Sequence, residues 1–116
     1  MPYFVLRYDQ VVDDYVNRRA PFRAEHLGLM RESQQRNEVV LAGAVGDPPD
    51  GALIVFRGDS PDVATRFAEN DPYVKNGLVL SWRVQPWQVV VGAQELAGMR
   101  RARVAWCLRQ KAFLPA

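Results

Sequence analysis

Residues 67–78 read FAENDPYVKNGL, and this stretch joins a helical pattern to the last strand pattern of the chain. Asp71 and Pro72 end the helix, because the residue before a proline is pushed out of the helical region of backbone space. An Asn-Gly pair at residues 76–77 then supplies a turn that tolerates a positive φ. Asp71 stands two residues before Tyr73. Because aspartate often caps backbone amides in turns, the stretch leaves both a capping and a chemical role open for Asp71.

Strand and helix patterns extend outward from this stretch on both sides. The sequence DSPD at residues 59–62 is a helix start, with a cap residue, a proline in the first turn and acidic residues near the helix N-terminus. Two apolar runs flank the turn sequence GDPPDG at residues 46–51 and predict a β-hairpin. The predicted strands are residues 3–9, 38–45, 52–57 and 78–91, and the predicted helices run from Pro21 to about Asn37 and from Asp59 to Asn70.

The predicted element order is β-α-β-β-α-β. This order is typical of the ferredoxin-like α+β class, in which two helices pack on one face of a four-stranded antiparallel sheet. Pro86 lies inside the last strand pattern and must fall on an edge, at a bend or in a bulge. Two helices cannot cover both faces, and the other face carries apolar and aromatic groups. The sequence therefore predicts a homodimer formed through that face.

Composition limits the kinds of protein this can be. The chain has 116 residues, enough for one domain with a real core, and is 48% hydrophobic and 24% charged, which is normal for a soluble globular protein. No apolar run approaches the roughly 18 residues that span a bilayer, and the first ten residues lack a signal-peptide pattern. We therefore expect a cytoplasmic protein with no membrane partner. One Cys, at position 107, and one His predict no intrachain disulfide, no metal site and no cofactor.

Charge divides the chain into a body, residues 1–92, and a basic C-terminal extension, residues 93–116, that is predicted to be helical. The extension carries five basic residues against one acidic residue, so the body is slightly acidic. No nucleic-acid partner is therefore predicted for the body. Two interpretations of the extension stay open. Its apolar residues rest on the domain or on a partner subunit, or its charge contacts an acidic partner, a membrane surface or nucleic acid.

The single histidine, His26, shares a helix face with Phe22, Leu29 and Met30. A histidine on an apolar face is often a core residue whose ring N–H is satisfied by a neighbour. In a split βαβ fold the two helices lie side by side, so His26 can meet Asp71 just after the second helix. A carboxylate on one ring nitrogen fixes the tautomer and makes the other nitrogen a better proton acceptor. A structural pair and a general-base pair both remain possible from the sequence.

Four segments in consistent order resemble the YciI-like (YCII-related) family: RAEHLGLM at 23–30, AGAVGD at 42–47, residues 67–78 and RVQPWQVV at 83–90. The resemblance implies a dimeric α+β barrel with His26 and Asp71 as the catalytic pair. Arg23 and Tyr73 match motif positions. One member of the family is similar to a dehydrochlorinase of chlorinated hydroxyquinol-type aromatics. The extension beyond Val91 lies outside the shared pattern, and the short hairpin turn leaves less loop to define a substrate.

The functional hypothesis is a cofactor-independent lyase or isomerase in which Asp71 orients His26 as the proton acceptor. Arg23, Tyr73, Tyr8 and Trp82 are the predicted substrate-binding residues, and the substrate is a small, aromatic or anionic molecule. Two alternatives stay open: a non-catalytic ligand-binding or interaction module, and a relative of the monooxygenases or haem-binding proteins of this fold. The single histidine makes haem ligation less attractive. An open, partly apolar pocket at the pair would favour an enzyme, and a sealed pair would favour the module.

Overall fold

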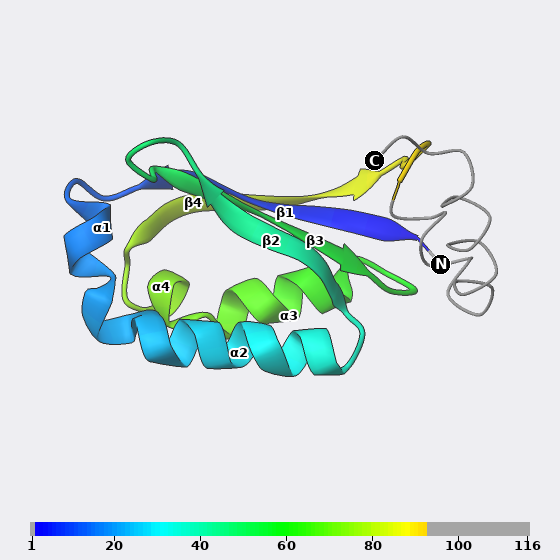
Figure 1. Cartoon of the computed structure of the whole chain (residues 1–116), viewed down its shortest axis with the longest axis horizontal. Helices are drawn as coiled ribbons and strands as arrows, with labels where there is room; N and C mark the ends of the chain where they lie inside the picture. Colours follow the sequence, from blue (N-terminus) through cyan, green and yellow to red (C-terminus); the bar gives the residue numbers. More distant parts are fainter. Residues whose placement is uncertain (1, 93–116) are drawn as a thin grey trace, which may run out of the picture.

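The computed structural model describes residues 2–92, and its centre is a four-stranded antiparallel sheet (Figure 1). The strands occur in the order β2-β3-β1-β4 across the sheet, so the first strand pairs with both the third and the fourth. This strand order confirms the predicted ferredoxin-like α+β class, in which the elements follow one another as β-α-β-β-α-β. The strand bounds are β1 (Tyr3–Val11), β2 (Val39–Val45), β3 (Gly51–Arg57) and β4 (Val79–Trp87).

All helices lie on one face of this sheet, and the other face has none (Figure 1). The helix that was predicted to start at Pro21 divides into a short 3-10 turn and an α-helix. Residues 72–75, predicted as part of a turn, form one extra helical turn, because Asp71 caps it and Pro72 suits its first position. The bounds are α1 (Tyr15–Arg18), η1 (Ala20–Phe22), α2 (Arg23–Gln35), α3 (Asp62–Asn70) and α4 (Pro72–Lys75).

The core lies between the sheet and the helices. Leu6, Ile54 and Phe56 point from β1 and β3 toward the helices and are almost completely buried. The apolar side chains of α3 form one stripe along the helix, and its four members are all buried. The stripe residues are Val63, Ala64, Phe67 and Ala68. On the strands, alternate residues face the opposite side of the sheet, as expected for a pleated strand.

The last strand is shorter than predicted and ends at Trp87 rather than Val91. Pro86 lies on β4, which is an edge strand, so the prediction for this proline is confirmed. In a regular strand Leu80 would share a face with Trp82 and Val84, but it is 61% exposed while the other two pack against the core. It lies where the pairing of β1 with β4 shifts register, and such irregularities bend and twist a strand locally.

Three predictions concern parts of the chain or properties that the structure does not test. The predicted helical extension, residues 93–116, lies outside the described residues, and the domain boundary at residue 92 stays a prediction. Within residues 2–92, the helices are all too short or too polar to cross a membrane. The cytoplasmic location stays a prediction.

Candidate functional site

Asp71 and His26 come together between the two long helices. Asp71 follows α3 directly and is 0% exposed, and His26 projects from α2 toward the sheet and is 9% exposed. The His26 Nδ1 atom lies 2.9 Å from Asp71 Oδ1. The hydrogen bond that the sequence predicted is therefore present, and it joins residues that are 45 positions apart.

Asp71 also accepts two further hydrogen bonds. The Tyr73 backbone N–H donates to Oδ1 at 3.0 Å, which is the bond that caps α4. The Tyr8 hydroxyl donates to Oδ2 from β1 on the sheet. The helix cap and the pairing with the imidazole thus involve the same carboxylate oxygen, Oδ1 of Asp71. A buried carboxylate needs such partners, since an unpaired one would be very costly.

Aromatic rings fix the orientation of the imidazole. The ring of His26 stacks on the ring of Tyr73, with centroids 4.0 Å apart and planes 9° apart. Phe67 of α3 meets the imidazole edge-on, with centroids 6.4 Å apart. Tyr15 in turn meets the ring of Tyr73 edge-on, with centroids 5.9 Å apart. The histidine is therefore held on its face and on one edge as well as by Asp71.

Two tyrosines near the carboxylate, Tyr8 and Tyr15, have raised pKa values. Burial raises the pKa of Tyr8 far above its ordinary value, and the charge of Asp71 and the hydrogen bond to it raise the pKa further. Burial also raises the pKa of Tyr15, followed by the nearby Tyr73, while Arg19 opposes this rise. Tyr8 is therefore a permanent hydrogen-bond donor to Asp71 at physiological pH.

A cleft of about 250 Å³ opens beside this cluster, bounded by α1, α2 and the β2-β3 hairpin. Four of the predicted site residues line it: His26, Arg23, Tyr73 and Tyr8. Trp82 does not line the cleft, and its role in substrate binding stays a prediction. Trp82 lies on β4, at the edge of the sheet opposite to β2, and packs against the core instead. The remaining lining residues are Tyr15, Arg19, Leu27, Met30, Ala42, Gly43, Ala44, Gly51, Ala52 and Ile54.

Tyr15 and Arg19 were not predicted from the sequence, and they add a ring and a cation to the lining of the cleft. The Arg19 guanidinium lies 5.3 Å from the centroid of the Tyr15 ring. The two residues are four positions apart, and this spacing places side chains on the same side of a helical turn. This four-residue spacing before Pro21 was the signal in the sequence that could have paired Tyr15 with Arg19. Among residues 2–92, no group of three or more His, Cys, Asp or Glu side chains is placed to hold a metal ion.

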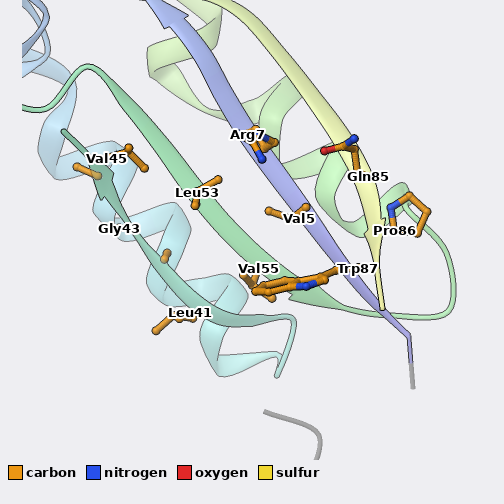
Figure 2. Close-up of a pocket in the computed structure, with 12 residues that line it drawn as sticks. Val5, Arg7, Leu41, Gly43, Val45, Leu53, Val55, Gln85, Pro86 and Trp87 are labelled. Carbon is orange, nitrogen blue, oxygen red and sulfur yellow. The ribbon is translucent and has the colours of Figure 1, made fainter. Parts of the chain in front are cut away.

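A second, larger hollow of about 620 Å³ lies on the sheet face that carries no helix, which we call the open face (Figure 2). Its side chains project from all four strands, and Figure 2 shows Trp87, Val55 and Leu53 among them. Arg7 is the one charged residue in its lining. Several of its apolar residues are strongly exposed, led by Leu41 at 68%. The other exposed apolar members are Val45, Leu53 and Trp87.

Comparison with known proteins supports the fold and identifies the family. No curated protein matches the sequence. The structure is similar to 5-chloro-2-hydroxyhydroquinone dehydrochlorinase (TftG) from Burkholderia phenoliruptrix AC1100, in complex with 2,5-dihydroxybenzoquinone, with a TM-score of 0.62 and 21% identity over 78% of this chain and 96% of that one. An antibiotic biosynthesis monooxygenase gives a TM-score of 0.49 and 11% identity over 78% of this chain and 100% of that one. The sequence model of the YCII-related domain matches residues 1–88, so the chain belongs to the YCII-related domain family.

Proposed function

We propose that the protein is an enzyme that moves a proton on a small molecule, with His26 as the general base and Asp71 as the residue that orients it. The observation that carries the proposal is the 2.9 Å contact between His26 Nδ1 and Asp71 Oδ1 beside a cleft that His26 itself lines. A sealed pair would have favoured a structural role. A base that lines a cleft can instead meet the proton of a bound molecule.

The hydrogen bonds define what each group does. Asp71 accepts from the Tyr8 hydroxyl and the Tyr73 amide, and in the same way it accepts from Nδ1–H of His26. Nε2 then carries the lone pair and takes a proton from an acidic O–H or C–H of the substrate. Asp71 stabilises the imidazolium that forms. The electron pair left on the substrate either expels a leaving group, as in a lyase, or accepts the proton back at another atom, as in an isomerase.

A lyase has a precedent on this fold. The similar protein from Burkholderia phenoliruptrix is a dehydrochlorinase, and its ligand is a small oxygenated ring. For this chain we therefore propose a lyase or isomerase reaction of dehydrochlorinase type on a compact molecule. The cleft supports a compact substrate, because its volume of about 250 Å³ lies below the roughly 300–1,000 Å³ of pockets for drug-sized ligands.

One observation favours a second candidate, a non-catalytic ligand-binding or interaction module. Asp71 is completely buried and caps α4, so its pairing with His26 also satisfies a carboxylate that the fold needs there. In such a module the pair would contribute to stability, and substitution of His26 would reduce the free energy of unfolding without removing any turnover.

We further propose that the protein is a homodimer in which the open faces of two copies pack together. The support is the cluster of exposed apolar side chains from all four strands, with a hollow of about 620 Å³ among them. Contiguous apolar patches are uncommon on soluble monomers and often mark an interface. A two-fold arrangement would place the same patch on both sides.

The proposed reaction is tested with 5-chloro-2-hydroxyhydroquinone, by measuring chloride release with an ion-selective electrode. We expect His26→Gln and Asp71→Asn each to lower the rate by about 10²–10⁴-fold, the usual cost of losing a general base or its support. Asn keeps the cap at the start of α4, so the fold should survive. Glu25→Gln is the matched control, because it removes an exposed carboxylate next to His26 and should leave the rate unchanged.

The isomerase form of the proposal is tested by NMR in D₂O, as exchange of the carbon-bound hydrogens of 2,5-dihydroxybenzoquinone. Wild-type protein should accelerate this exchange, and His26→Gln should not. A wild-type protein that neither releases chloride nor accelerates the exchange would favour the non-catalytic module.

A further inference from the structure

The lining of the cleft carries an unbalanced charge. Arg19 and Arg23 are its two permanently charged residues, and its lining contains no Asp or Glu. Asp71 lies beneath the surface and is already engaged by Tyr8, His26 and the Tyr73 amide. The two arginines therefore bring more positive charge to the cleft than the single negative charge of Asp71 offsets, and a walled cleft strengthens such a field.

Arg19 is held in place rather than left to extend into solvent. It is half-buried, and its guanidinium lies 5.3 Å from the centroid of the Tyr15 ring. Within residues 2–92, neither Arg19 nor Arg23 forms an ion pair, whereas Arg36 pairs with Glu38 and Arg83 pairs with Asp9. A fixed guanidinium without a protein carboxylate is well suited to bind an oxyanion, because its planar fork loses little freedom on binding.

The Tyr73 hydroxyl supplies a second, independent observation. Tyr73 lines the cleft and is 1% exposed, yet its hydroxyl has no hydrogen-bond partner among the described residues. Buried hydroxyl groups normally have a partner, and leaving one without a partner is costly. Because Tyr73 lines the cleft, an oxygen of a bound ligand is a suitable partner for this hydroxyl.

We propose that the cleft binds a small organic anion, whose carboxylate or ionised enol oxygen pairs with Arg19, with Arg23 at the mouth, and whose body contacts Tyr73. The proposal rests on the proposed function only in taking this anion as the substrate of His26. The binding itself follows from the arginines and the tyrosine. Carboxylates and ionised enols share the oxyanion that a guanidinium recognises, and the test separates them.

The experiment measures affinity by the shifts of backbone amides in the ¹⁵N-labelled full chain. The probes are benzoate and the neutral benzamide, which has nearly the same shape, and 2,5-dihydroxybenzoquinone as the acidic enol. We expect benzoate or the enol to bind at least about tenfold more tightly than benzamide, since hydrogen bonds to charged groups are the stronger ones. The amides of Tyr73 and His26 should shift, and added salt should weaken the binding of the anion. Whichever anion binds more tightly identifies the source of the oxyanion.

Variants locate the site. Arg19→Gln should lower the affinity for the anion by about ten- to a hundredfold, and Tyr73→Phe should lower this affinity by a smaller factor. Arg18→Gln is the matched control, because Arg18 is exposed on α1 next to Arg19 and does not line the cleft. Equal affinity for benzamide and the anions, no saturable binding of either anion, or equal effects of Arg18→Gln and Arg19→Gln would each overturn the proposal.

Failure of the proposed function would look different. His26→Gln should retain the anion affinity, because His26 is not part of the charge recognition. Tight anion binding without turnover of any bound anion would overturn the catalytic role of His26 and leave the anion site in place.

Discussion

The two faces of the sheet carry hollows of opposite character. The helix-covered face holds a cleft of about 250 Å³ beside a buried carboxylate, a histidine, two arginines and three tyrosines. The open face holds a hollow of about 620 Å³ with an apolar lining and one arginine. The larger hollow has no group that could move a proton near neutral pH, whereas the smaller one gathers several polar groups around one buried carboxylate. Volume alone therefore does not identify the candidate active site of this molecule.

The same sheet produces both faces, because successive residues of each strand point to opposite sides. On β1, Tyr8 and Leu6 point toward the helices, and Val5 and Arg7 point to the open face. Substitutions at neighbouring positions of one strand should therefore act on different functions. Four predictions use this separation, beginning with the largest expected effect.

Leu53→Glu should disrupt the proposed dimer and leave the cleft intact. The substitution places a charge in an apolar interface, and a two-fold axis places it there twice, so we expect the dimer Kd to rise by at least roughly a hundredfold. Analytical ultracentrifugation measures the mass. Leu80→Glu is the control, because Leu80 is more exposed than Leu53 but does not line the open-face hollow. A wild-type protein that is monomeric at all concentrations would remove the proposed interface.

Tyr8→Phe should affect the covered face alone. It leaves Asp71 Oδ2 buried without its donor, and a hydrogen bond to a charged group contributes about 1.5–3 kcal/mol. We expect urea unfolding to show a loss of free energy in this range. Tyr3→Phe is matched to it, because Tyr3 lies on β1 and its hydroxyl makes no side-chain hydrogen bond within residues 2–92. Equal losses for the two variants would mean that the bond to Asp71 adds little.

Gly51→Ala should disturb the cleft through the backbone of Tyr8. A Cβ atom at position 51 would lie 2.7 Å from the Tyr8 carbonyl oxygen, so the backbone of one strand must move. Overpacking of this kind costs about 1–3 kcal/mol. Gly43 also lines the cleft, but a Cβ there would meet no atom within 4 Å, so Gly43→Ala should be tolerated. Thermal unfolding of the two variants compares them, and equal melting temperatures would contradict this explanation.

Stability should fall at alkaline pH because of the buried phenols. The pKa values of Tyr8 and Tyr15 are raised in the folded state above the ordinary value of 10.0, so above that pH the unfolded chain loses protons that the folded protein keeps. The free energy of unfolding is unaffected well below pH 10 and then decreases by up to about 1.4 kcal/mol per pH unit for each phenol. Urea unfolding between pH 9 and pH 11 measures this slope. Tyr8→Phe should make the slope shallower, and an unchanged slope would show that Tyr8 does not contribute.

The fold was largely predictable from local patterns, and the errors in the predicted helices and strands have local causes. The strands and the two long helices follow from alternation, helical spacing and turn residues, which act over a few positions. The short helix α4 was missed because Asp-Pro both ends one helix and starts another. The end of β4 was placed four residues too late, since the apolar residues that follow Trp87 continue the strand pattern without pairing.

The candidate site was predictable where two residues had few alternatives. His26 is the single histidine, and Asp71 ends the helix that lies beside it in this fold, so their meeting could be inferred before any coordinates. The aromatic residues around this pair could not be assigned in the same way. Trp82 and Tyr8 are opposite each other in the β1–β4 pairing, yet Tyr8 alone reaches Asp71 and the cleft.

Local sequence patterns were sufficient to predict the order of the long elements and the meeting of His26 with Asp71. These depend on spacing along the chain and on the chemistry of single residue types. The three-dimensional arrangement was needed to see that the Tyr8 hydroxyl donates to Asp71, that Arg19 rather than Trp82 lines the cleft, and that the larger of the two hollows lies on the open face. Those contacts join residues from different elements, and their geometry depends on how the helices cross the twisted sheet.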